Sequence, residues 1–297
     1  MQNDKIAFKS VYGMENCMIK NIGKNILNII AVLIIFIFSN EIGMIAAQIF
    51  DNHYLALITN SVVYIAVLLL LGGLYSKKVL KMDMKEIGVS KKGMSVKYLA
   101  MAILLPIVIL LIYIFIIPGH IVKSEEKEIG IVLAYAILRI GINAGIGEEF
   151  CFRGLMFRYM KKTLGVKAAV IIPAVVFASL HITNMDTFHV VDLMLLLLAG
   201  SSVSVMFTMM ALKSETIWVG ALSHALWNIL IIGGIFGIGD IVNGTANNAV
   251  IQIIPDSSNT LLTGGNFGVE ASMVAIIGYV LVAVICAKLG KKQNNML

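Results

Sequence analysis

Acidic, basic, imidazole and amide side chains occur within three strongly apolar segments of the sequence, where they could form a catalytic site. A charged side chain at the centre of a bilayer costs about 2.5–3.5 kcal/mol on insertion scales, so several of them require pairing or a function. A carboxylate, two imidazoles and an amide are residue types that can activate water and stabilise an oxyanion. The residues concerned are Glu148, Glu149, Arg153, Phe177, His181, His224 and Asn228.

Four-residue spacings place several of these side chains on shared helix faces. Glu149 and Arg153 are four residues apart, which predicts an ion pair on one face and leaves Glu148 about 100° around the helix, free to act as a general base. The same spacing relates Phe177 to His181 and His224 to Asn228. A purely structural interpretation stays open, because ion pairs and interhelical hydrogen bonds also hold membrane helices together.

The predicted depths of these residues agree. At about 1.5 Å per helical residue, Glu148, His181, His224 and Asn228 lie roughly 16–22 Å from the basic loops at one end of their segments. The apolar core of a bilayer is about 30 Å thick, so the four residues reach a similar level within it. We therefore predict that they converge in one site inside the membrane.

The composition indicates that membrane helices position these residues. Hydrophobic residues make up 59% of the 297 residues and charged residues 13%, whereas a soluble domain is nearer half and a quarter. In lipid, backbone groups must be paired within each segment, which favours helices. We predict an all-α integral membrane protein with about eight transmembrane helices, over residues 26–50, 55–76, 98–117, 129–157, 166–183, 190–212, 216–236 and 270–289.

Basic residues predict the orientation. Nineteen of the 23 Lys and Arg fall in the N- and C-terminal segments and alternate loops, whereas Lys123 and Lys127 are the two in the other loops. Such a bias is typical of cytoplasmic loops, so both termini are predicted to be cytoplasmic. The expected location is the cell membrane of a bacterium, with the lipid bilayer and not nucleic acid as the partner of the basic residues.

The predicted organisation has four parts. Residues 1–25 form a cytoplasmic segment, residues 26–128 the N-terminal helices, residues 129–236 the catalytic membrane domain, and residues 237–297 an outer loop with the last helix. The stretch 237–269 is rich in Gly and Asn and lacks Lys and Arg, and no chemistry is assigned to it.

Three polar positions outside the motifs also lie in the apolar segments. Asn40 and Glu41 interrupt the first segment and either line the same cavity or cap a broken helix, with a structural role favoured. Arg139 is expected to extend its side chain outward from the fourth segment.

The three motifs together resemble those of a known protein family. Glu148-Glu149-Arg153 as EExxxR, Phe177-His181 as FxxxH and His224-Asn228 as HxxxN resemble the CAAX protease and bacteriocin-processing family, which includes type II CAAX prenyl endopeptidases and proteins of the Abi and lysostaphin-resistance type. The resemblance covers about residues 129–236. It implies an eight-helix membrane endopeptidase with a cavity that opens toward the cytoplasm.

The roles that the resemblance implies follow the motifs. Glu148 with His181 would activate water, and His224 with Asn228 would stabilise the oxyanion. Glu149 and Arg153 would hold the helix geometry, while Phe177 supports His181.

The residue types lead to a similar chemistry. We see no Ser–His or Cys–His nucleophile, so water activated without a cofactor is favoured, with a peptide or membrane protein as substrate. Zinc held by Glu148, His181 and His224 is the alternative, although HExxH spacing is absent.

Two other functions compete with the endopeptidase. The first is a non-catalytic membrane protein for bacteriocin self-immunity or envelope scaffolding. The second is a transporter, since intramembrane acids also mark ion paths, but no repeat supports it.

Overall fold

Apolar helices form most of the chain. The computed structural model describes all residues except 1, 124–127, 185–188, 234, 240–248 and 295–297, and it leaves the side chains of residues 2–19, 184 and 290–294 undescribed. Lys127 and part of the predicted outer loop 237–269 therefore lie outside the described residues.

Six helices in the described ranges are long and apolar enough to cross a membrane, and two shorter apolar helices accompany them. The six are Lys20–Ala47 of α1 (Gln2–Ala47), His53–Leu80 with α2 (His53–Tyr75), α3 (Val96–Phe115), Ile129–Thr163, Val166–Thr183 with α7 (Val166–Leu180), and α8 (Val190–Ser214). The shorter two are Trp218–Ile232, which contains α9 (Trp218–Trp227), and Met273–Leu289 of α11 (Met273–Asn294). The multi-pass membrane class is confirmed, while the count of eight spans and their sidedness stay predictions.

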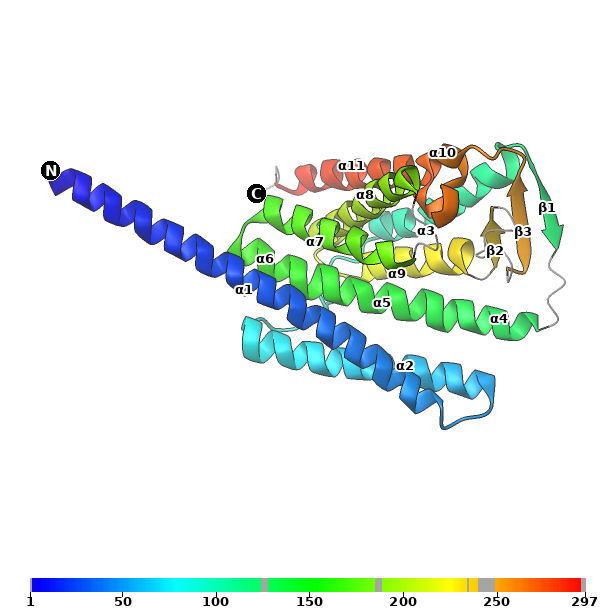
Figure 1. Cartoon of the computed structure of the whole chain (residues 1–297), viewed down its shortest axis with the longest axis horizontal. Helices are drawn as coiled ribbons and strands as arrows, with labels where there is room; N and C mark the ends of the chain where they lie inside the picture. The colour runs from blue at the N-terminus through cyan, green and yellow to red at the C-terminus, as the bar shows by residue number, and fades with distance from the viewer. Residues whose placement is uncertain (1, 124–127, 185–188, 234, 240–248, 295–297) are drawn as a thin grey trace.

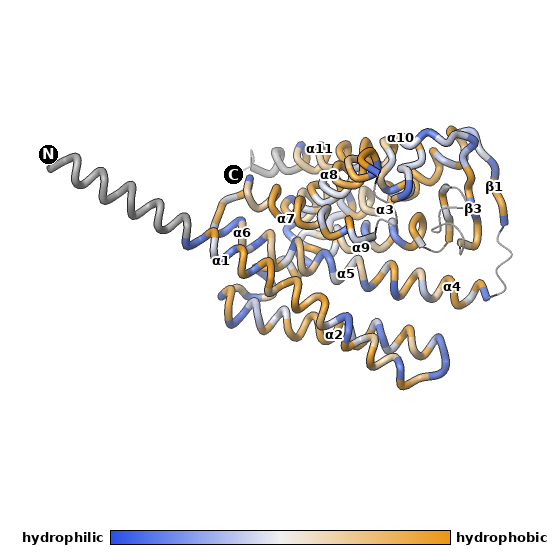
Figure 2. The backbone as a smooth tube through the Cα atoms, in the orientation of Figure 1, coloured by the Kyte–Doolittle hydropathy of each residue, from blue (hydrophilic) through white to orange (hydrophobic). Residues whose placement is uncertain are grey.

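Hydrophobic residues predominate along these helices (Figure 2). On α1, for example, Ile26, Leu27, Ile34 and Ile37 are each more than half exposed. Contiguous apolar surface of this kind is unfavourable in water and marks contact with lipid or another protein. The exposed face of α1 therefore fits a lipid environment.

A three-stranded sheet departs from the all-α prediction. Its strands are β1 (Gly119–Lys123), β2 (Phe236–Ile238) and β3 (Ile251–Pro255), in the order β1-β3-β2, with β1 antiparallel and β2 parallel to β3. The sheet joins the predicted outer loop 237–269, with the last residue of the predicted helix 216–236, to the outer loop that contains Lys123. Backbone groups in these connections need hydrogen-bond partners where they pack together. At Gly119 a Cβ would lie 2.5 Å from the Ile254 carbonyl oxygen, so only glycine allows this approach.

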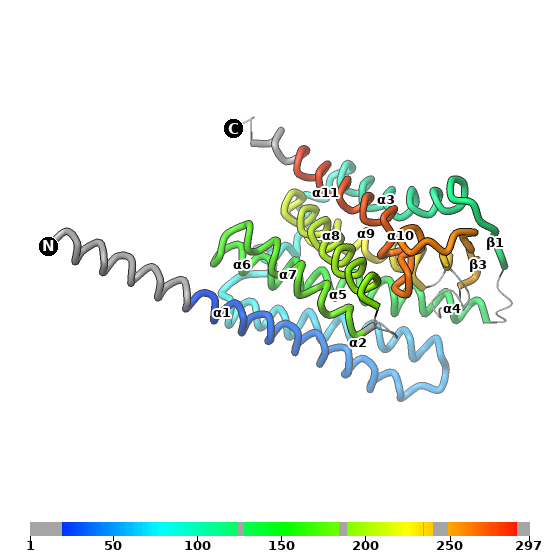
Figure 3. The backbone as a smooth tube through the Cα atoms, turned by 45° about the horizontal axis from the view of Figure 1, so that its top comes forward, coloured from blue at the N-terminus to red at the C-terminus, as the bar shows by residue number. Residues whose placement is uncertain are grey.

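The two ends of the helix bundle differ in structure. The described C-terminal part of α11 and the start of α7 lie at one end, and the sheet lies at the other (Figures 1 and 3). Residues 76–95 and the turn after α8 share the first of these ends, which we call the lysine end. The end that carries the sheet is called the strand end.

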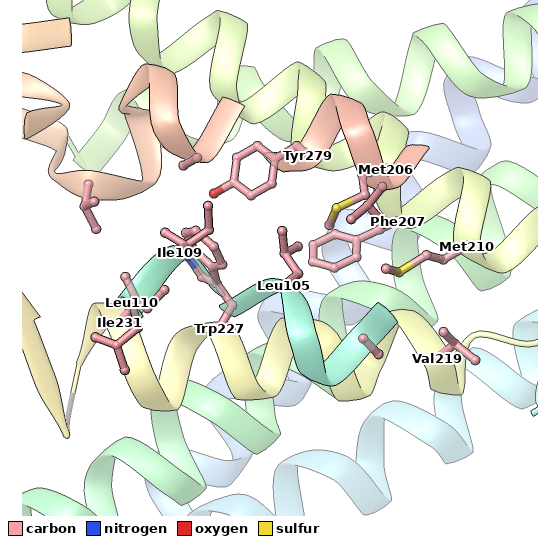
Figure 4. Close-up of a cluster of buried hydrophobic side chains, with 14 of the residues drawn as sticks. Leu105, Ile109, Leu110, Met206, Phe207, Met210, Val219, Trp227, Ile231 and Tyr279 are labelled. Carbon is pink, nitrogen blue, oxygen red and sulfur yellow. The ribbon is translucent and has the colours of Figure 1, made fainter. Parts of the chain in front are cut away.

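Two apolar cores hold the site helices in place. In the first, α3, α8, α9 and α11 meet around residues that include Leu105, Phe207, Trp227 and Tyr279 (Figure 4), and the Trp227 and Tyr279 rings lie 5.2 Å apart. The second core joins residues 80–87 to Phe150–Met156 and Ile217. The site lies between the two cores.

Candidate active site

One helical run carries the two acidic residues of the first motif. Residues 129–163 run through α4 (Ile129–Tyr135), α5 (Ala144–Glu148) and α6 (Phe157–Thr163), which are joined by π-helical segments at Ala136–Asn143 and Glu149–Met156. π-helical turns are rare and often occur at functional sites, because they rotate the following side chains. Glu148 ends α5 and Glu149 begins the second π-helical segment, so the two carboxylates point to different surroundings.

Glycine allows this run to approach its neighbours closely. A Cβ at Gly145 would lie 2.8 Å from the Ala221 carbonyl oxygen and 2.9 Å from the backbone nitrogen of Ala225. Both are main-chain atoms of α9, which carries His224. Gly145 therefore permits the approach that brings α5 and α9 into contact.

Glu149 lies at the centre of a buried polar network. Its Oε1 accepts hydrogen bonds from Arg153 Nη1 at 2.8 Å and from His224 Nδ1 at 3.1 Å. Glu149 and Arg153 are fully buried, and Arg153 Nη2 also donates to the Ser204 hydroxyl at 2.9 Å and the Ser204 carbonyl at 3.2 Å. The predicted Glu149–Arg153 pair is present. Its hydrogen bonds connect the π-helical segment Glu149–Met156 to Ser204 of α8 and to His224 of α9.

His224 is held between aromatic rings and faces Glu148. Its ring stacks on Phe207 with centroids 4.9 Å apart, and the edge of Phe177 lies 6.5 Å away. The donation from Nδ1 to Glu149 leaves Nε2 toward Glu148 Oε2 at 3.8 Å. That separation is beyond a direct hydrogen bond, so the Glu148 carboxylate, 19% exposed, stays available to water or substrate.

His181 is oriented by its own helix. It directly follows α7 and begins a 3₁₀ turn, with its Nδ1 2.8 Å from the Phe177 carbonyl oxygen. A carbonyl only accepts, so Nδ1 carries the hydrogen and Nε2 of the neutral ring is an acceptor. The His181 and Phe177 ring centroids lie 4.6 Å apart, as the shared helix face predicts.

Asn228 is anchored to the helical run of the first motif. It starts the π-helical segment Asn228–Ile232, and its side-chain nitrogen donates to the Ile140 carbonyl oxygen at 2.9 Å. An amide nitrogen carries two hydrogens, so one remains for another acceptor. Asn228 is 7% exposed.

All four predicted site residues line one cavity of about 570 Å³. Glu148, His181, His224 and Asn228 reach it from three separate helical regions, and α8 supplies an apolar wall that includes Gly200 and Val203. Ligand cavities commonly combine an apolar lining with a few convergent polar groups.

Arg139 differs from the sequence prediction. Instead of extending outward, its Nη1 donates to Asn40 Oδ1 of α1, and both residues line the cavity. Pairing with an amide inside the bundle satisfies the guanidinium without exposing it to lipid. Asn40 therefore lines the cavity, whereas the predicted helix break is wrong, because α1 continues unbroken through Asn40 to Ala47.

Glu270 is a cavity residue that the sequence analysis missed. It lies in the 3₁₀ turn Val269–Ala271, before α11, and its carboxylate faces a cavity that also holds His181, His224 and Glu148. Burial raises the pKa of Glu270 to about 7, with Glu148 adding to the rise and the two histidines opposing it. We predicted Glu270 as the first residue of the helix 270–289, whereas α11 begins at Met273, and a single glutamate there carries no motif.

The zinc alternative has no preformed ligand group in the described part of the chain. Within the described residues, no three His, Cys, Asp or Glu side chains are placed to hold a metal ion together. The Nδ1 of His224 contacts Glu149 and that of His181 contacts the Phe177 carbonyl oxygen, so a metal ion would have to bind these histidines through Nε2. We therefore derive no step through a metal.

Comparison with known proteins gives one family match. Residues 130–230 match the family described as type II CAAX prenyl endopeptidase Rce1-like. No curated protein and no solved structure matches the chain. The matched range includes the three motifs and confirms, over residues 130–230, the resemblance inferred from them. Asn40 and Glu270 lie outside the matched range.

Proposed function

Because residues 130–230 belong to the type II CAAX prenyl endopeptidase Rce1-like family, a family of membrane proteases, we propose that this chain is an intramembrane endopeptidase that uses water activated by Glu148. The observation that carries the proposal is the convergence of Glu148, His181, His224 and Asn228 on one cavity between apolar helices. The substrate is a peptide or a segment of a membrane-associated or lipidated protein.

The first step is attack by water. The Glu148 carboxylate takes a proton from the water as its oxygen bonds to the scissile carbonyl carbon. His181 orients that water, because the Nδ1 contact with Phe177 leaves Nε2 as a hydrogen-bond acceptor. The product of the step is a tetrahedral oxyanion with the proton on Glu148.

The second step is collapse of the oxyanion. The second amide hydrogen of Asn228 and a protonated Nε2 of His224 donate to the negative oxygen. Glu148 then passes its proton to the amide nitrogen as the C–N bond breaks, which releases an amine and a carboxylic acid. Glu149 supports this step, because its hydrogen bond fixes the His224 ring.

Other nucleophiles have poorer geometry. Cys151 is fully buried within the second apolar core, and Ser179 is exposed on the outer surface of α7. Neither residue lines the cavity. Water therefore remains the nucleophile of the proposal.

Comparative peptidomics tests the proposal in cells. Membranes with the wild-type protein are expected to yield fragments that disappear with Glu148→Ala and with His181→Ala. Ser179→Ala is the matched control, because this side chain lies near His181 in sequence and outside the cavity. Identical fragment sets from wild-type and Glu148→Ala membranes would favour the non-catalytic immunity or scaffolding role.

A chelator experiment tests the metal-free mechanism. Hydrolysis by the purified protein is expected to persist in a strong zinc chelator. Loss of activity on chelation, with recovery on adding zinc, would refute the metal-free mechanism while keeping the protease.

A further inference from the structure

One cation faces the catalytic cavity without a neutralising acid. Among the described residues that line this cavity, Arg139 is the only Lys or Arg. It belongs to the helical run of the first motif, between Glu148 and the strand end, where α4 lies (Figure 1). The ion pairs found in the described ranges do not include Arg139. An unneutralised charge in a membrane-spanning segment is costly, so it points to a function.

The contacts of Arg139 leave most of its guanidinium available. Nη1 donates to Asn40 Oδ1, and Nη2 contacts the Met44 sulfur at 3.8 Å. The Asn40 amide thus satisfies a hydrogen bond but brings no negative charge. A guanidinium carries five N–H hydrogens, and its planar fork matches the two oxygens of a carboxylate. Arg139 therefore keeps donors for an anion in the cavity.

Tyr64 of α2 supplies a hydroxyl near Arg139. Its ring is 2% exposed in the second apolar core, with the Phe36 ring edge-on and the centroids 6.2 Å apart. A Cβ at Gly147 would overlap the Tyr64 hydroxyl oxygen, so glycine lets this hydroxyl lie against the backbone directly before Glu148. The charges of Glu148 and Arg139 both act on the Tyr64 hydroxyl. Because Tyr64 lines the cavity, a ligand there can reach this donor.

The acids that line the cavity are engaged elsewhere. Glu148 Oε2 faces His224 Nε2 at 3.8 Å. The charges that act on Glu270 are those of the two site histidines and Glu148. Within the described part of the cavity, the negative partner of Arg139 therefore has to come from a bound molecule.

The two donors lie beside the groups of the proposed mechanism. Asn228, the proposed oxyanion donor, bonds to the carbonyl oxygen of Ile140, the residue after Arg139. Tyr64 and Arg139 line the same cavity as Glu148. A peptide bound at Glu148 can therefore place a negative group against both donors.

We propose that Arg139 and the Tyr64 hydroxyl form a subsite that binds a carboxylate of the substrate peptide. The carboxylate is that of the chain terminus or that of an Asp or Glu side chain, since both present the same two oxygens. The role of the bound peptide as a protease substrate rests on the proposed function, whereas carboxylate binding does not.

Binding to the Glu148→Gln protein tests the subsite without hydrolysis. The probes are fluorescently labelled apolar hexapeptides that differ only in charge: one amidated, one with a free C-terminal carboxylate, and one amidated with a central Asp. A carboxylate peptide is expected to bind about 10–100-fold more tightly than the neutral peptide, because hydrogen bonds to charged groups contribute on this scale. The peptide that shows the preference identifies the source of the carboxylate. Equal affinities for all three would overturn the subsite.

Matched variants of the same protein assign the preference to the two donors. Adding Arg139→Gln is expected to abolish the preference, and adding Tyr64→Phe to reduce it several-fold. Lys97→Gln removes an exposed cation of α3, and Tyr75→Phe removes an α2 hydroxyl outside the cavity. Both are expected to keep the preference. A preference that survives Arg139→Gln would overturn the subsite.

Asn40→Ala separates the charge from the helix contact. It removes the same bond between α1 and the helical run but keeps the guanidinium, so the preference for a carboxylate is expected to persist. A loss in Asn40→Ala as large as that in Arg139→Gln would assign the effect to helix packing and overturn the subsite.

Hydrolysis connects the subsite to the proposed function. For a peptide that the wild-type protein cleaves, Arg139→Gln is expected to raise KM about 10–100-fold at a similar kcat, and to have no such effect on the analogue that lacks the carboxylate. A fall in kcat at unchanged KM would instead give Arg139 a role in the chemical step and overturn the subsite. If the wild-type protein cleaves no peptide, the proposed function fails, while the binding measurement still decides the subsite.

Discussion

Glu149 Oε1 accepts a hydrogen bond from His224 Nδ1 at 3.1 Å and so joins the first motif to the third inside the helix bundle. The same oxygen accepts from Arg153 Nη1 at 2.8 Å. The buried Glu149 carboxylate therefore fixes the orientation of the His224 ring, whose Nε2 faces Glu148. Of the two adjacent glutamates, Glu149 has the supporting contacts, and Glu148 has the catalytic role in the proposed mechanism.

Replacing Glu149 is expected to destabilise the protein. Glu149→Gln keeps the shape but leaves the buried Arg153 guanidinium without its counter-charge, and removing one partner of a buried pair costs about 3–5 kcal/mol. Thermal unfolding in detergent should show a large drop in melting temperature. Glu86→Gln is the control, because its pair with Lys162 at 3.9 Å is largely exposed and worth about 0–1 kcal/mol. Equal melting temperatures for Glu149→Gln and wild type would refute the supporting role.

Gly145→Ala is expected to push the first-motif helix away from α9. The added methyl would meet the Ala221 carbonyl oxygen at 2.8 Å, and overpacking of this kind costs about 1–3 kcal/mol. Because the shift separates Glu149 from His224, hydrolysis should fall together with melting temperature. Gly23→Ala on α1 meets nothing within 4 Å and should leave both unchanged. Wild-type activity in Gly145→Ala would show that the close approach is unnecessary.

Removing the Asn228 amide is expected to slow the chemical step. Loss of one oxyanion donor typically reduces kcat about 100–1,000-fold, so Asn228→Ala should lower kcat with little change in KM. The lost bond to the Ile140 carbonyl oxygen also predicts a small drop in melting temperature. A raised KM at unchanged kcat would instead assign Asn228 to substrate binding.

Glu270 is expected to make stability depend on pH near neutrality. Its folded-state pKa is raised to about 7, whereas an unfolded glutamate titrates near 4.3. The folded state therefore binds the proton more tightly, and stability should fall as pH rises from about 4.3 through about 7. Melting temperatures of wild type should decline over this interval more steeply than those of Glu270→Gln. Asp51→Asn, an exposed acid at the same end, should keep the wild-type slope; parallel curves for wild type and Glu270→Gln would exclude this effect.

Local periodicity predicted the contacts that lie within one helix. Hydropathy located the membrane helices, and four-residue spacing predicted both the Glu149–Arg153 pair and the contact between Phe177 and His181. These relationships depend on about one helical turn of a single element. Polar residues at similar depths in three apolar segments also predicted that Glu148, His181, His224 and Asn228 share a cavity. All four residues line the same cavity in the structure.

Contacts between distant segments could not be predicted in the same way. The bond from His224 to Glu149 spans 75 residues, and the pairing of Arg139 with Asn40 spans 99. Glu270 and the three strands lie at the ends of predicted helices or in the connections between them, where position depends on tertiary packing. The π-helical turns beside Glu149 and Asn228 likewise leave no simple pattern in the sequence.

The most direct measurement is peptide hydrolysis by purified, bilayer-reconstituted Glu148→Gln beside wild type and Ser179→Ala. A lost general base lowers the rate about 100–10,000-fold, so Glu148→Gln should show that loss at an unchanged melting temperature, while Ser179→Ala keeps the wild-type rate. A folded Glu148→Gln protein that hydrolyses peptides at the wild-type rate would contradict the account.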